Sequence, residues 1–74
     1  MAFRQIMTDR RIYHVTRTSD DSWQVVKEGF TRPHIIRESK EEAVIVARRL
    51  ARNTPAGQVI VHRADNVVER EYLY

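Results

Sequence analysis

The chain has 74 residues, a formal net charge of +3 and no cysteine. This length predicts one small domain with a limited core, and the lack of cysteine excludes disulfides and thiolate metal sites and favours a reducing, cytoplasmic location. No apolar run approaches the roughly 20 residues that span a bilayer, so we expect no membrane partner.

The excess of positive charge lies near the start of the sequence. Residues 1–11 carry three arginines and one aspartate, a net +2, whereas ten basic residues face nine acidic ones over the remainder. We therefore expect residues 1–11 to form a flexible basic leader and residues 12–74 to form a single α+β domain.

The first part of this domain has the pattern of a β-hairpin. Residues 12–17 are rich in β-branched and aromatic side chains, residues 18–22 are turn formers, and residues 23–28 alternate between two faces. This alternation places Trp23 and Val25 toward a helix, with Trp23 as its main anchor. Residues 34–37 follow Pro33 and form a short candidate third strand.

The segment from Ser39 to Pro55 has the signals of one amphipathic helix. Ser39 and Glu42 match a capping box, and Asn53 with Pro55 supplies a stop. Acidic residues fall in the first turn and arginines in the last, which complements the helix dipole. The predicted buried stripe consists of Ala43, Val46, Ala47 and Leu50.

Two more strands complete the predicted order. Residues 58–62 read as a central strand, residues 63–66 as a turn, and residues 67–72 as the last strand. The fold class is α+β: a mainly antiparallel sheet of four to five strands with one helix on one face, in the order β-β-β-α-β-β. The other face must meet water, a partner chain or a ligand.

Three segments resemble a family of small bacterial proteins known only as a domain of unknown function. They are Tyr13-His14-Val15, the Trp23-x-Val25-x-Lys27-Glu28-Gly29 strand, and, after the alanine- and arginine-rich helix, Val59-Ile60-Val61-His62-Arg63 with Asp65 in the closing turn. The resemblance implies the same order of elements, a bacterial or prophage origin and no assigned activity.

The sequence offers no pattern of catalytic or metal-binding residues. His14, His34 and His62 lack the close spacing of metal ligands on one element, although His62 with Arg63 is the pair to inspect first. The serines fit turn and cap positions, and the two glycines cannot form a phosphate loop. Glu41 with Glu42 reads as a capped helix start, and Glu69 with Glu71 as one solvated strand face. We expect no enzyme activity, no cofactor, no metal and no small-molecule substrate.

Two functional hypotheses remain. The first is a non-catalytic binding or accessory module that forms homo-oligomers through its open sheet face or an edge strand. Ile45, on the charged side of the helix, could form an exposed apolar interface patch with Val26, Ile36 or Ile35, and Tyr72 or Tyr74. The alternative is sequence-tolerant binding of nucleic acid by the leader and by Arg48, Arg49, Arg52 and Arg63. A solvated helix end that suits the helix dipole explains the same helix arginines.

Overall fold

The computed structural model describes residues 10–74. It contains five strands and one helix, in the predicted order. Residues 1–9 of the expected leader lie outside the described part, whereas Arg10 and Arg11 lie inside it and Arg11 opens the first strand. The elements are β1 (Arg11–Arg17), β2 (Trp23–Lys27), β3 (Ile35–Arg37), α1 (Lys40–Arg52), β4 (Gly57–His62) and β5 (Val68–Leu73).

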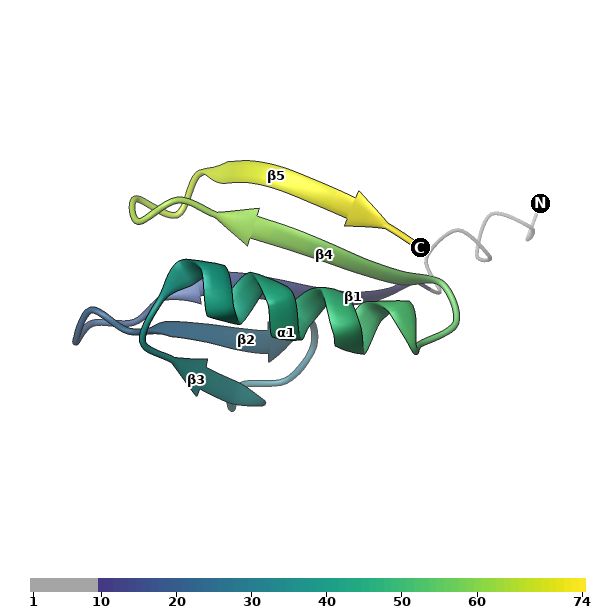
Figure 1. The fold of residues 1–74 in the computed structure, drawn as a ribbon, viewed down its shortest axis with the longest axis horizontal. Coiled ribbons are helices and arrows are strands. Elements are labelled where there is room, and N and C mark those ends of the chain that lie inside the picture. The colour runs from purple at the N-terminus through teal and green to yellow at the C-terminus, as the bar shows by residue number, and fades with distance from the viewer. Residues whose placement is uncertain (1–9) are drawn as a thin grey trace.

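All five strands form one mixed sheet in the order β3-β2-β1-β4-β5. Three neighbouring pairs are antiparallel, and the central pair, β1 with β4, is parallel. The helix connects β3 to β4 and packs on one face of the sheet (Figure 1). The predicted α+β class and the single covered face are confirmed.

The helix begins and ends where its caps predict. The Ser39 hydroxyl accepts a hydrogen bond from the Glu42 backbone N–H at 3.1 Å, and Asn53 is the C-cap. Ala43, Ala47 and Ala51 are fully buried against the sheet. The buried stripe of the helix is therefore rotated slightly from the predicted one. Val44 and Leu50 pack at its margins, and Val46 is not among the core residues.

Small aliphatic side chains form the centre of the core. Val15, Val25 and Val59 are the largest side chains with no exposed surface. Trp23, predicted to be the main anchor, is only partly buried at the margin, where the Lys40 ammonium lies 5.5 Å from its ring centroid. The alanines explain this difference, because they bring the helix so close to the sheet that no space remains for an indole between them.

A register shift between Val61 and His62 changes the last strand. Glu69 forms an ion pair with Lys40 at the start of the helix, whereas Glu71 accepts a hydrogen bond from Gln58 at 3.2 Å. The prediction that both glutamates lie together on one solvated face is therefore wrong, because the bulge interrupts the alternation. Within residues 10–74 no helix is long and apolar enough to cross a membrane.

Candidate functional site

The face of the sheet opposite α1 is covered by no element of the described chain. Side chains alternate along each strand, so the neighbours of the buried valines point to this open face. The strand register arranges them in rows: Ile12 beside Gln58, and His14 between Val26 and Ile60. The apolar members of the open face are Ile12, Val26, Ile36, Ile60, Val68 and Leu73.

Several of these apolar side chains are strongly exposed. Ile36 is 53% exposed, Val68 49% and Leu73 65%. The two edge strands are poor sites for strand addition, because β3 has three residues and the middle of β5 reads Glu-Arg-Glu. These exposed apolar side chains belong to the open face instead.

A chain of side-chain contacts crosses the middle of the open face. The Glu28 carboxylate lies 2.8 Å from His14 Nε2, and His14 Nδ1 lies 3.0 Å from His62 Nε2. His62 Nδ1 lies 3.2 Å from the backbone carbonyl oxygen of Asn66. The parallel pairing of β1 with β4 brings these two histidines together.

Sequence reasoning missed this pair because His14 and His62 are 48 positions apart. The sequence does not show that their two strands are neighbours. His62 contacts His14 and not Arg63, which was the pair singled out for inspection. His34 lies elsewhere, edge-on to Tyr13 and Phe30 with ring centroids 6.0 Å apart in both cases. Among the described residues no group of three or more His, Asp or Glu side chains is arranged to hold a metal ion.

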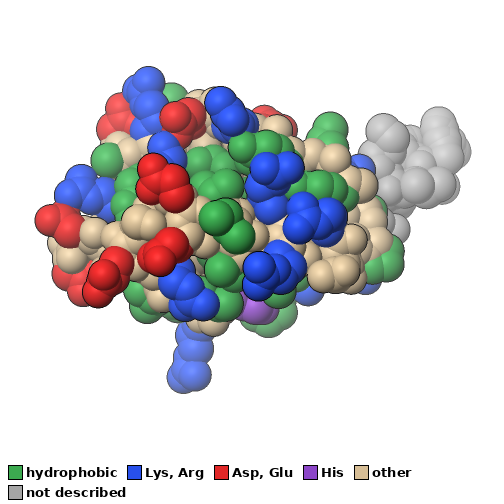
Figure 2. Space-filling view, viewed as in Figure 1, with side chains coloured by type: hydrophobic (Ala, Val, Ile, Leu, Met, Phe, Trp, Pro, Cys, Tyr) green, Lys and Arg blue, Asp and Glu red, His purple; other side chains and the backbone are tan. Residues whose placement is uncertain are grey.

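The helix-covered side has a separate group of positive charges (Figure 2). Arg48 lies 4.1 Å above the Tyr72 ring centroid, and Arg70 lies 6.0 Å from the same centroid. The hydrogen bond from Arg48 Nε to the Tyr74 hydroxyl, 2.7 Å long, raises the pKa of Arg48. Two guanidinium groups therefore share one tyrosine ring, and no ion pair among residues 10–74 involves either of them.

The predicted arginine cluster is only partly brought together. Arg48, Arg49 and Arg52 lie on the C-terminal half of α1. Arg63 lies in the β4–β5 turn, at the opposite end of the molecule, and pairs with Asp65 at 2.8 Å (Figure 1). The expectation that Arg63 extends the patch is wrong. β4 starts near the C-terminal end of the helix and runs back along it, so the turn after β4 lies near the other end of the helix (Figure 1). Arg70 on β5, which shares the Tyr72 ring with Arg48, lies beside the helix arginines instead.

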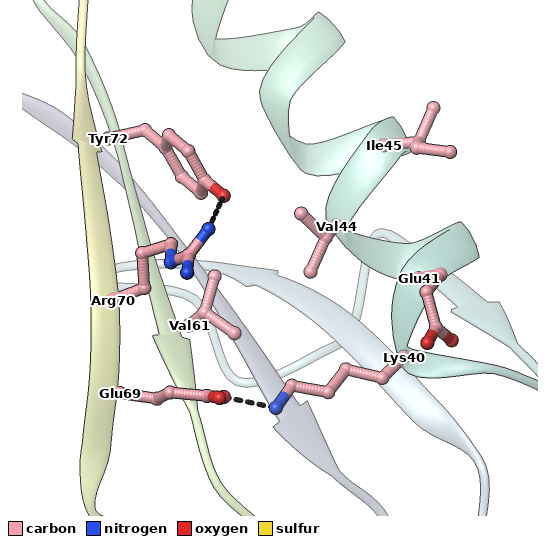
Figure 3. A pocket seen from close by; sticks show the side chains of 8 residues that line it. All are labelled: Lys40, Glu41, Val44, Ile45, Val61, Glu69, Arg70 and Tyr72. Atoms are coloured by element: carbon pink, nitrogen blue, oxygen red, sulfur yellow. Dashed lines mark hydrogen bonds and ion pairs between the residues drawn. The ribbon is translucent and has the colours of Figure 1, made fainter.

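A shallow groove of about 430 Å³ separates the N-terminal half of α1 from β5. Figure 3 shows apolar Val44 and Val61 lining it, with Lys40 reaching Glu69 and Arg70 reaching the Tyr72 hydroxyl. Most of its polar groups already contact one another. The groove therefore offers few free partners to a polar ligand.

The four residues predicted to form one apolar patch lie on two sides of the sheet. Val26 and Ile36 belong to the open face. Ile45, which is 57% exposed, and Tyr72 line the groove beside the helix. The open face instead includes Ile12, Ile60, Val68 and Leu73. Alternation along the predicted strands assigns Ile12 and Ile60 to one face, whereas Val68 and Leu73, five positions apart, share it only because of the bulge.

Among known proteins, a bacterial family matches the chain. No curated protein and no solved structure matches it. The bacterial family matches residues 13–74, which is nearly all of the described part. The chain therefore belongs to the family described as uncharacterized protein conserved in bacteria (DUF2188).

Proposed function

We propose that this protein is a non-catalytic module that self-associates by packing the open sheet face against a second copy of itself. The observation that supports this proposal is the exposed apolar surface of the sheet opposite the single helix. It holds six apolar side chains, and its most exposed members would leave water in a dimer.

The size of the open face sets the expected strength of the dimer. Strands about 4.8 Å apart and outward rows about 6.6 Å apart give the five-stranded sheet a face of roughly 400 Å². Two copies would then bury about 800 to 1,000 Å² in total, which is typical of weak and transient interfaces. We expect a reversible dimer in the micromolar range or weaker, with monomer present on dilution.

A second copy suits this face better than a nucleic acid does. The positive patch around Arg48 lies on the opposite side of the sheet, so it does not repel a second copy at the open face. The strand order places β1 at the centre of the sheet. A two-fold axis near His14 would therefore bring equivalent apolar rows together, as an isologous dimer requires.

Two exposed isoleucines allow a matched test of the proposal. Ile36 on the open face is 53% exposed and Ile45 on the helix is 57% exposed. In sedimentation velocity over a wide concentration range, Ile36→Asp should abolish the dimer, and Ile45→Asp should leave it intact. A wild-type protein that stays monomeric at high micromolar concentration contradicts the proposal, as does equal loss of the dimer in both variants.

Nucleic-acid binding is the second candidate because Arg48 and Arg70 flank one tyrosine ring without a carboxylate partner among residues 10–74. Such cations contact phosphates, and their affinity falls with salt. Arg48→Ala should then weaken binding to short single-stranded and duplex oligonucleotides at low salt. Arg63→Ala, which removes a charge already paired with Asp65, is the matched control. Absence of binding at low salt eliminates this candidate.

A further inference from the structure

The contacts of the histidine pair on the open face indicate which ring nitrogens carry a proton. A carboxylate and a backbone carbonyl can only accept hydrogen bonds. Glu28 therefore favours a proton on His14 Nε2, and the Asn66 carbonyl favours one on His62 Nδ1. A neutral imidazole carries only one ring proton, so two neutral rings would direct two lone pairs at each other across 3.0 Å.

One additional proton between the two rings resolves this conflict. The facing nitrogens are 3.0 Å apart and the ring centroids are 5.2 Å apart, so both nitrogens lie near the line that joins the centroids. This is the linear arrangement of an N–H···N hydrogen bond. A metal ion held by both nitrogens would require lone pairs that converge on a point away from that line.

We propose that His14 and His62 share one extra proton, and that this proton controls self-association of the open face. With the proton in place, its positive charge balances the Glu28 carboxylate, and every contact in the chain from Glu28 to Asn66 has a donor. Loss of the proton leaves an unbalanced carboxylate and two facing lone pairs, and a second extra proton leaves an unbalanced positive charge. Each of these charged states opposes burial in a dimer. This inference rests on the proposed function.

Other charged groups also lie on or beside the open face. Arg10 donates to Gln58 Oε1 at 3.1 Å. Glu71 lies on β5 beside Ile60. Beyond His62, the β4–β5 turn carries Arg63 paired with Asp65, and hydrogen bonding from Arg63 lowers the pKa of Asp65. The helix lies on the other face of the sheet. Histidine is the side-chain type that ordinarily changes charge between roughly pH 5 and 8, so we assign changes of the open face in this range to the pair.

Nitrogen-15 NMR of the ring nitrogens at low concentration tests proton sharing without any need for a dimer. We expect His14 Nε2 and His62 Nδ1 to stay protonated throughout, while His14 Nδ1 and His62 Nε2 lose one shared proton together as the pH rises. Independent titration of the two rings, or the opposite tautomer on either ring, overturns the sharing.

Sedimentation velocity against pH tests the control of assembly. The wild type should associate most tightly at the pH where the pair holds one extra proton. Above and below that pH the association constant should fall at least about tenfold, which is the effect of one lost hydrogen bond or one unbalanced charge. Glu28→Gln keeps an acceptor but removes the charge, so its association should only increase with pH. His34→Gln, which alters a histidine outside the pair, should keep the wild-type profile.

The outcomes separate the two claims. A dimer whose strength does not change with pH overturns the pH control and leaves the proposed function standing. A monomer at every pH overturns the proposed function and the pH control together, and the ring signals then still decide whether the proton is shared.

Discussion

Gly57, the first residue of β4, lies against the backbone of Ala51 in the last turn of the helix. A Cβ atom at Gly57 would contact the Ala51 carbonyl oxygen, and would lie 2.7 Å from the carbonyl carbon and 2.9 Å from Cα. These distances are too short for any side chain, and backbone atoms cannot rotate away as a side chain can. The helix can therefore lie close to the sheet at this point only because residue 57 is glycine.

Gly57→Ala should destabilise the fold by about 3 kcal/mol or more, since an added methyl group meets rigid backbone. Gly29→Ala is the matched control: Gly29 has a positive φ of 93° but open space where a Cβ would lie, so the substitution should cost about 1 to 2 kcal/mol. Urea unfolding followed by circular dichroism measures both. A Gly57→Ala variant as stable as Gly29→Ala contradicts this account of the helix position.

Two neighbouring helix positions test how closely the helix packs. Ala47 has no exposed surface, so Ala47→Leu should overpack the core and reduce the free energy of unfolding by about 1 to 3 kcal/mol. Ile45→Ala, on the exposed side of the helix, should change it by no more than about 0.5 kcal/mol. Thermal unfolding of the two variants should rank them in that order, and the reverse order would show that the buried stripe is misplaced.

The helix and the hairpins could be predicted because their signals are local. Ser39 and Glu42 are three positions apart, and alternation of side chains marks the strands directly. The turns at Gly29 and Asn66, which both adopt positive φ, use residue types that tolerate the left-handed region. Such features depend on neighbours in the sequence, and for that reason the fold class followed from the residues alone.

The arrangement of the open face could not be predicted from local patterns. The contact between His14 and His62 depends on the parallel pairing of β1 with β4, and neither strand carries a signal for its neighbour. The bulge in β5 opposite His62 similarly places Glu69 and Glu71 on different sides of the sheet. Pairing between distant strands decides which side chains meet, so the candidate site appears only with the tertiary structure.

The ion pair between Lys40 and Glu69 gives the fold a dependence on acidic pH. The hydrogen bond from Lys40 lowers the pKa of Glu69 in the folded state, so this contribution is present above the unfolded pKa and is lost as the pH falls through the folded one. Glu69→Gln should therefore be less stable than the wild type at pH 7, and the difference should vanish in acid. Urea unfolding at both ends of this range measures it, and a difference that persists in acid would indicate another cause.

The described isoleucines allow the most direct measurement of the central claim, that the open face binds a second copy. Ile12, Ile36 and Ile60 lie on the open face, whereas Ile35 packs against the core and Ile45 lies on the helix. In a dilution series followed by methyl NMR of the isoleucine δ1 groups, the signals of Ile12, Ile36 and Ile60 should move with concentration while those of Ile35 and Ile45 stay fixed. Signals that all stay fixed, or that move only at Ile45, would contradict the account.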